Sequence, residues 1–224
     1  MKYSIKQHKE LNDYFHAFNS DNIQYYESLK YFLLKTKKIK GNILEFGVGR
    51  GRSAIASCHI MNEYNINKKY FAFDSFEGFG NITDKDKSYR NPKPGEWAIS
   101  PKKQFKYSIK NIKKILSYHI YKNNFKKIKF IKGFVEDTLK KYKFNSISFI
   151  NLDLDLYSGH KTVLENTFEK LSKYGIIYFD DVVLKDKKPP FPGAHLAVNE
   201  YFKNKKNIKK YYCKLRKNLV IQKI

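Results

Sequence analysis

The chain has 224 residues, which suits one α/β domain with a substantial core. Its net charge is +24, but the lysines are spread from Lys2 to Lys223 among many Ile, Asn, Tyr and Phe residues. We therefore attribute the charge first to compositional drift in an AT-rich genome, then to an acidic or phosphorylated substrate, and last to nucleic acid or an anionic membrane.

Several features argue for a cytoplasmic protein without a membrane span. No run approaches the roughly 18 apolar residues of a membrane helix, and the first residues lack the apolar segment of a signal peptide. Cys58 and Cys213 are too far apart to indicate a disulfide framework or a zinc site, and we expect Cys58 in the core.

The first half of the chain predicts alternating helices and strands. Within an N-terminal helical segment, residues 1–40, Ser20 and Asp21 cap a predicted helix that begins near residue 23 and ends near Gly41. The next elements are a strand over 42–46, a tight loop over 47–51, a helix over 53–64 and a strand over 70–74.

Residues 76–104 form a long insert with many glycines and prolines and little periodicity. So long an irregular segment in a compact domain is usually functional or disordered, and we interpret it as a lid that carries Trp97, the only tryptophan. The apolar residues that follow, over 105–120, recur at helical spacing and indicate a helix packed on the core.

The second half predicts strands over 129–131, 147–152 and 175–179, helices over 161–172 and 195–203, and a closing antiparallel hairpin over 211–215 and 219–224. Alternating strands and helices indicate one domain, residues 1–224, with a mostly parallel sheet and right-handed crossovers. Binding sites in such sheets lie outside the carboxyl ends of the strands.

Four carboxylates lie at the ends of two predicted strands. Asp153 and Asp155 follow the apolar run 147–152, and Asp180 and Asp181 follow the run 175–179. A single aspartate is usually a cap or a turn residue, but four acids so placed would repel one another unless a cation or a proton held them. If the strand continued through 155, Asp153 and Asp155 would share one face about 6.5 Å apart. We predict a divalent-metal site with a catalytic base beside it.

A glycine loop lies between the first strand and its helix. Glu45 begins an acid-x-Gly-x-Gly-x-Gly pattern that ends at Gly51, and glycines there let a ligand approach the backbone. The NAD fingerprint needs glycine at position 52, where this chain has Arg52. Asp74, at the end of the next strand, suits a ribose diol. Together these features indicate an S-adenosylmethionine pocket, with a plain turn and helix cap as the alternative.

At this point the sequence resembles a known family, the macrocin O-methyltransferase (TylF/MycF-like) family. The resemblance runs over residues 22–204 through the segments 44–53 (LEFGVGRGRS), 73–78 (FDSFEG), 133–138 (GFVEDT), 152–157 (LDLDLY), 180–181 (DD) and 192–194 (PGA). It implies a class I methyltransferase (Rossmann-like) fold, with a seven-stranded sheet, and magnesium-dependent methylation of a sugar hydroxyl.

The resemblance also implies roles for individual residues. The cofactor residues would be Glu45, Gly47 and Ser53 near the methionine part, Asp74 and Ser75 near the ribose, and Phe134, Glu136 and Asp137 near the adenine, with Gly49, Phe76 and Gly133 as further cofactor-binding residues. The metal ligands would be Asp153, Asp180 and Asp181, with Asp155 as the base. His195 stands where the family usually has arginine, so substrate contacts there can differ.

Three alternatives differ from this interpretation. A nucleic-acid methyltransferase would use the basic surface, but amino-methylating members need an Asn/Asp-Pro-Pro-aromatic motif after the fourth strand, and the nearest match, residues 188–191 (KPPF), follows the fifth. A metal-dependent catechol-type O-methyltransferase and a non-catalytic sugar-nucleotide binder also remain. We expect a small-molecule sugar or sugar-nucleotide substrate, nucleotide-activated or from a surface polysaccharide, and we leave open a homodimer or larger homo-oligomer.

Overall fold

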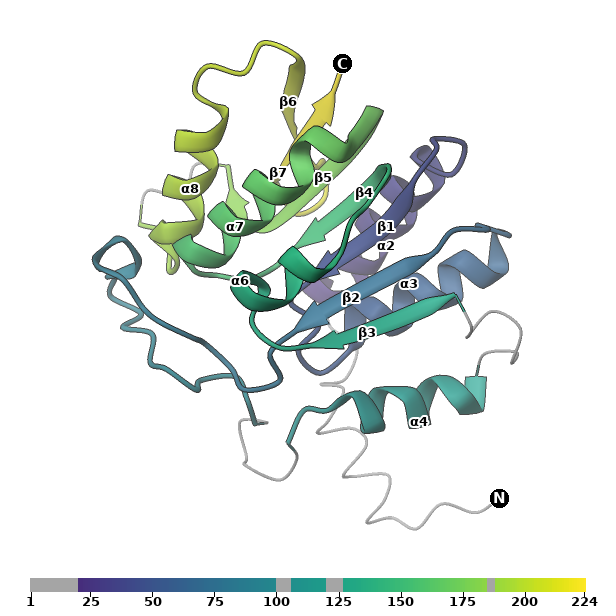
Figure 1. Ribbon diagram of the computed structural model, residues 1–224, viewed down its shortest axis with the longest axis horizontal. Coiled ribbons are helices and arrows are strands. Elements are labelled where there is room, and N and C mark those ends of the chain that lie inside the picture. Colours follow the sequence, from purple (N-terminus) through teal and green to yellow (C-terminus); the bar gives the residue numbers. More distant parts are fainter. Residues whose placement is uncertain (1–19, 100–105, 120–126, 185–187) are drawn as a thin grey trace.

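The structure is a computed structural model that describes residues 20–99, 106–119, 127–184 and 188–224. Its centre is a seven-stranded sheet in the order β3-β2-β1-β4-β5-β7-β6 (Figure 1). The strands are β1 (Asn42–Phe46), β2 (Tyr70–Asp74), β3 (Ile128–Lys132), β4 (Ile147–Leu152), β5 (Leu171–Val183), β6 (Ile208–Tyr212) and β7 (Asn218–Lys223).

Strand directions confirm the predicted mostly parallel sheet with a closing antiparallel hairpin. Strands β1 to β5 run parallel to one another, whereas β7 is antiparallel to β5 and to β6. Three predicted strands, over 42–46, 70–74 and 147–152, have the predicted bounds. Strand β5 is longer at both ends than predicted, and β6 begins and ends three residues earlier.

Helices cover both faces of the sheet (Figure 1). One face carries α2 (Ser20–Lys35), α3 (Arg52–Glu63) and α4 (Ile109–His119), and the other carries α6 (Val135–Thr138), α7 (Tyr157–Thr167) and α8 (Pro192–Phe202). Short 3₁₀ turns are η1 (Asp84–Asp86), η2 (Leu139–Lys141) and η3 (Phe168–Lys170). Alternate strand residues point to opposite faces, so Ile43 packs in one core cluster and Leu44 in the other.

The apolar faces of the helices form the core as expected. Ile112 and Leu116 of α4 are fully buried, which confirms that this stripe packs on the domain, and Cys58 of α3 is buried beside it. None of the helices in the described ranges is long and apolar enough to cross a membrane.

The ladder between β5 and β7 is interrupted near the carboxyl end of β5. Residues 176–178 pair with 220–222, and pairing resumes only at Val183 with Asn218. The Asn218 amide bridges the gap by donating from Nδ2 to the backbone oxygen of Asp180 and accepting from the Tyr178 hydroxyl. Asp180 and Asp181 therefore lie in a stretch without regular β7 partners.

The described part of the insert, residues 76–99, packs against α7 and α8. The ring of Phe79 lies 5.8 Å from that of Phe191, and the Ser88 hydroxyl donates to the backbone oxygen of Pro190. Residues 100–104 of the predicted lid lie outside the described residues, as does the N-terminal segment before residue 20.

Candidate active site

A cavity of about 640 Å³ opens at the carboxyl ends of the central strands. Most of the predicted site residues line it, namely Gly47, Gly49, Ser53, Asp74, Ser75, Gly133, Phe134, Glu136, Asp137, Asp153, Asp155 and Asp180. Glu45, Phe76 and Asp181 are not among its lining residues. The cavity therefore joins the glycine-loop side of the sheet to the aspartate side.

Glycine is required at position 47, where the loop leaves β1. Gly47 has a φ of 87°, and a Cβ atom there would lie 1.6 Å from the backbone oxygen of Asp153. Any side chain would push the loop away from the end of β4. The glycine thus brings the loop directly against the strand end that carries the first aspartate.

Glu45 is buried beneath the glycine loop. Its carboxylate accepts hydrogen bonds from the hydroxyls of Ser53 and Tyr70. Burial raises the pKa of Glu45 to about 7, against the opposing effect of these two donors. Because Glu45 does not reach the cavity, it acts on the site by fixing the Ser53 side chain.

Asp74 holds the glycine loop in place from the end of β2. Its Oδ2 atom accepts from the backbone N–H groups of Val48 and Gly49, both at 2.7 Å, and its Oδ1 atom accepts from Phe76 N–H at 2.5 Å. Burial raises the pKa of Asp74, and the three backbone donors oppose that rise. A carboxylate has about four acceptor positions, so capacity remains for a ligand hydroxyl.

The far end of the cavity is formed where β3 meets α6. Gly133 has a φ of 131°, so the backbone turns sharply there before Phe134 and α6. The insert lies over this end, because a Cβ on Gly80 would come within 2.9 Å of the Phe134 ring. An aromatic side chain, an adjacent acid pair and a covering loop suit a planar base.

Three aspartates gather on the other side of the cavity. One carboxylate oxygen from each of Asp153, Asp155 and Asp181 lies within 4.8 Å of the others. Burial raises the pKa of all three, and the negative charges of neighbouring aspartates add to the effect, so that the pKa of Asp181 rises to about 7. The group is therefore short of positive charge.

Asp155 reaches this group through a turn and not through a continued strand. Strand β4 ends at Leu152, so the same-face geometry expected for an extended strand does not occur. The N–H of Leu156 donates to the oxygen of Leu154 at 2.6 Å around Asp155, whose φ is 62°. This is the rare, strained form of the γ-turn. It directs the Asp155 N–H to Asp181 Oδ2 at 2.9 Å.

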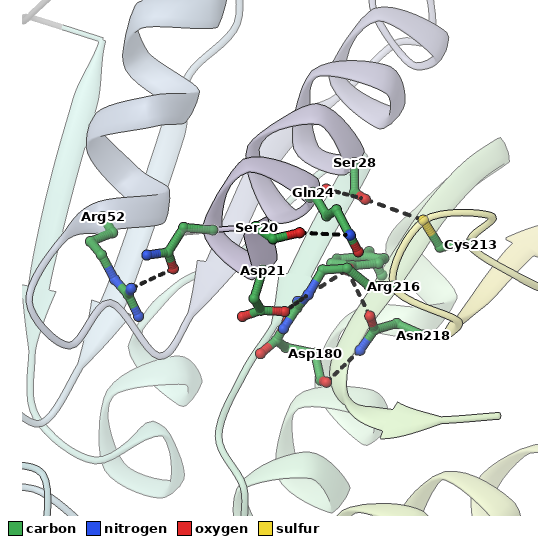
Figure 2. A network of polar contacts seen from close by, with 11 residues as sticks. Ser20, Asp21, Gln24, Ser28, Arg52, Asp180, Cys213, Arg216 and Asn218 are labelled. Carbon is green, nitrogen blue, oxygen red and sulfur yellow. Dashed lines mark hydrogen bonds and ion pairs between the residues drawn. The ribbon is translucent and has the colours of Figure 1, made fainter. Parts of the chain in front are cut away.

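Asp180 stands apart from the three-acid group, although it was predicted as a metal ligand. Its Oδ1 atom pairs with the guanidinium of Arg216 from the β6–β7 turn (Figure 2). Of the predicted ligands, Asp153 and Asp181 thus meet Asp155, whereas Asp180 lines the cavity beside an arginine. Sequence reasoning missed Arg216, because a lone arginine in a turn has no periodic or motif signal.

His160 lies directly beneath the acids. It is fully buried, with Nδ1 3.0 Å from the oxygen of Leu156 and Nε2 3.5 Å from Asp181 Oδ2. Burial lowers the pKa of His160 to about 4, so the ring is neutral at pH 7. His195, the other histidine considered, lies on α8 and is not among the cavity-lining residues.

Asp86 was also missed by sequence reasoning. It is only 1% exposed, and its Oδ1 atom accepts from the N–H of Tyr157, the first residue of α7, at 2.7 Å. A Cβ on Gly193 would lie 1.9 Å from the same oxygen, so α8 packs tightly over this contact. Asp86 thus ties the insert to the helix that starts two residues after Asp155.

The strand order, the antiparallel β7 and the site at the carboxyl ends together define the class I methyltransferase fold. The chain is similar in structure to the O-methyltransferase NovP, with a TM-score of 0.70 and 20% identity over 90% of this chain and 80% of that one. It is also similar to the calicheamicin methyltransferase CalS11, with a TM-score of 0.72 and 21% identity over 90% and 79%.

The chain belongs to the macrocin O-methyltransferase (TylF) family, whose profile matches residues 30–220. It is 26% identical over 167 residues to mycinamicin III 3''-O-methyltransferase of Micromonospora griseorubida, an alignment that covers 73% of this chain and 61% of that protein. It is 23% identical over 171 residues to demethyldecarbamoylnovobiocin O-methyltransferase of Streptomyces niveus, covering 73% and 58%. The match thus spans about three fifths of these relatives' length.

Proposed function

We propose that the protein transfers a methyl group from S-adenosylmethionine to a sugar hydroxyl, with a magnesium ion held by the aspartates. One observation carries the proposal: a glycine loop fixed by Asp74 and a group of three half-buried aspartates line or adjoin the same cavity. The family membership supports the same chemistry.

The glycine-loop side fits the cofactor. Gly47 and Gly49 leave the backbone open to a ligand, Asp74 has acceptor capacity for ribose hydroxyls, and Phe134 offers a ring for the adenine. S-Adenosylmethionine supplies an electrophilic methyl group on a sulfonium centre. The residues of the chain have to orient that group and keep water away. The contact of Gly80 with the Phe134 ring supports the insert as a cover over the cofactor.

The aspartate side fits a divalent metal. Oxygen ligands suit Mg²⁺, and three half-buried carboxylates with raised pKa values lack the positive charge that a dication provides. Asp153, Asp180 and Asp181 are the proposed ligands. A bound Mg²⁺ would supply the positive charge that makes a sugar hydroxyl acidic enough to lose its proton.

Asp155 is the proposed base. Its carboxyl lines the cavity, and its backbone N–H is anchored on Asp181, so the side chain is held at the edge of the acid group. In its ionised form Asp155 accepts the hydroxyl proton as the methyl group is transferred. The left-handed backbone at this residue turns its side chain out of the line of β4.

We propose a nucleotide-activated or surface-polysaccharide sugar as the acceptor, and a nucleotide-activated acceptor would place the reaction in the cytoplasm. The relatives named for mycinamicin and novobiocin steps support a small glycosylated substrate over nucleic acid. The Pro-Pro-aromatic segment has a structural role, since Pro190 accepts from Ser88 and Phe191 packs on Phe79. It does not line the cavity.

The test is a screen of nucleotide-activated sugars for methyl transfer with S-adenosylmethionine and Mg²⁺. Turnover should stop after chelation with EDTA and return with added Mg²⁺, and S-adenosylhomocysteine should bind by calorimetry. RNA serves as the competing substrate at physiological salt, where sequence-independent phosphate binding fades. Methylation of RNA and of no sugar, or full activity after exhaustive chelation, would overturn the proposal.

A further inference from the structure

Arg216 is the cation that pairs with Asp180, the acid beside the three-aspartate group. It lies in the turn between β6 and β7, and its side chain is only 15% exposed. Its Nη1 atom donates to Asp180 Oδ1, and its Nε atom donates to Asp21 Oδ1 of α2 at 3.0 Å (Figure 2). The arginine therefore joins the last hairpin, the end of β5 and the start of the first described helix.

The position of Arg216 is fixed by its surroundings. Its guanidinium carbon lies 4.8 Å from the centre of the Tyr25 ring, and Nη1 is 3.3 Å from the Tyr178 hydroxyl. Tyr25 itself lines the cavity. A guanidinium held on an aromatic face and between two carboxylates is a built contact, unlike the mobile ion pairs of a protein surface.

No other lysine or arginine within the described ranges forms an ion pair with Asp153, Asp155, Asp180 or Asp181. The remaining close partner is His160, which is neutral. Arg216 thus supplies the positive charge nearest to four crowded acids. Removing either partner of a buried ion pair strongly destabilises the folded protein, because the other charge is left uncompensated.

We propose that Arg216 is an internal counter-cation that competes with the divalent metal for Asp180 and so sets the metal affinity of the site. The inference rests on the proposed metal site. If the guanidinium stays on Oδ1 of Asp180, it repels a dication that binds the same carboxylate. If it moves away, the metal has to replace the lost ion pair, so metal binding is weaker in either case. In the metal-free protein the same contact balances part of the charge of the acids, so the site forms before a metal is present.

The experiment measures direct Mn²⁺ binding, by electron paramagnetic resonance and calorimetry, without turnover. Arg216→Gln should bind Mn²⁺ about tenfold more tightly than wild type, because a unit charge on a shared carboxylate repels a dication on this scale even with the screening of water. A merely structural role would give the opposite result, because a damaged site binds metal more weakly. Unchanged S-adenosylhomocysteine affinity reports that the fold is intact.

The matched control is Lys205→Gln, which removes the same charge from an ion pair with Glu169 that is not part of the cavity. Its Mn²⁺ affinity should equal that of wild type. Arg216→Lys keeps the charge on a shorter side chain, so it should fold in any case and tighten Mn²⁺ binding by a smaller factor than Arg216→Gln.

Equal or weaker Mn²⁺ binding in Arg216→Gln overturns the inference. If that variant does not fold, equal or weaker binding in Arg216→Lys overturns it in the same way. A wild-type protein without EDTA-reversible Mn²⁺ binding would instead refute the metal part of the proposed function, and the inference with it. The two failures are thus distinguishable from the wild-type titration alone.

Discussion

The two sides of the cavity satisfy their acids in different ways. On the glycine-loop side, Asp74 accepts three backbone N–H groups, and Glu45 accepts two hydroxyls. On the aspartate side, Asp153, Asp155 and Asp181 face one another, and the nearest cation pairs with Asp180. One side is completed by neutral donors of the chain, whereas the other needs added positive charge.

This difference separates two tasks. A site completed by its own hydrogen bonds is preorganised, so it binds a ligand without first having to change shape. Crowded carboxylates hold protons more tightly, and in the proposed site a metal ion would compete with those protons and with Arg216, so its affinity should depend on pH. We expect variants on the first side to change cofactor binding and variants on the second to change rate, metal affinity and pH response.

The largest expected effect is on catalysis at Asp155. Asp155→Asn should lower kcat by about 10²–10⁴, the usual result of losing a general base, with little change in cofactor affinity and a smaller loss of metal affinity than in Asp153→Asn. Asparagine tolerates the left-handed backbone at this position, so the turn should survive. Steady-state kinetics and calorimetry measure both properties.

Asp153→Asn is the matched variant from the same acid group. It should weaken metal binding, and its activity should partly recover at high Mg²⁺. Rescue of Asp155→Asn by magnesium, without rescue of Asp153→Asn, would reverse the two assigned roles.

The next effect is on cofactor affinity at Asp74. Asp74→Ala removes the acceptor for three backbone donors and the proposed acceptor for the ribose, and hydrogen bonds to a charged group contribute about 1.5–3 kcal/mol each. S-Adenosylhomocysteine should bind at least about tenfold more weakly by calorimetry, while Mn²⁺ affinity stays unchanged. Asp84→Ala, at an exposed ion pair of the insert, is the control. A parallel loss of Mn²⁺ binding would show that the two sides are not independent.

A third effect is on stability as a function of pH. The folded-state pKa values of Asp153, Asp155 and Asp181 lie above the unfolded values, so the folded protein retains protons that the unfolded chain has released. Metal-free stability should therefore fall as pH rises from about 4 towards 7, by about 1.4 kcal/mol per pH unit for each retained proton. Denaturant titrations at several pH values measure this slope.

Saturating Mg²⁺ should flatten that pH dependence, because a dication favours the ionised carboxylates. Asp181→Asn should also reduce the slope, since it removes one of the titrating groups. Stability that rises with pH over this range in the metal-free protein would contradict the assignment.

The smallest expected effect is at Asp86, which links the insert to the aspartate side. Asp86→Asn removes the charge at the N-terminus of α7 and should cost about 1–2 kcal/mol of unfolding free energy. Asp84→Asn, two residues away and exposed, should cost much less. Equal melting temperatures for the two variants would show that the contact with Tyr157 contributes nothing measurable.

Local patterns in the sequence were sufficient for most of the fold. The strands over 42–46, 70–74 and 147–152 are short apolar runs bounded by polar or glycine residues, and they have the predicted bounds. Helix α7 begins at Tyr157 and not at residue 161. Gly159 lies in the first turn of α7, where a Cβ would be only 3.0 Å from the Leu154 side chain, so the helix start packs closely on the preceding turn.

The sequence predicted those site residues that lie close together in the sequence or directly follow a strand. The acids of 153–155 and 180–181 are visible as carboxylates at strand ends, and the glycine loop precedes its helix directly. Arg216 and Asp86 contact residues that are far away in the sequence, Asp180 and Tyr157. Such contacts depend on how the hairpin and the insert pack, which neither spacing nor periodicity encodes.

The hairpin also gives the site an order of assembly. A ribosome releases β4 and β5, with all four aspartates, before the turn that carries Arg216 and the strand that begins at Asn218. Until that turn emerges, the nascent chain holds its acids without the arginine that pairs with Asp180. Arg216 can therefore join Asp180 only after the strands that carry all four acids have left the ribosome.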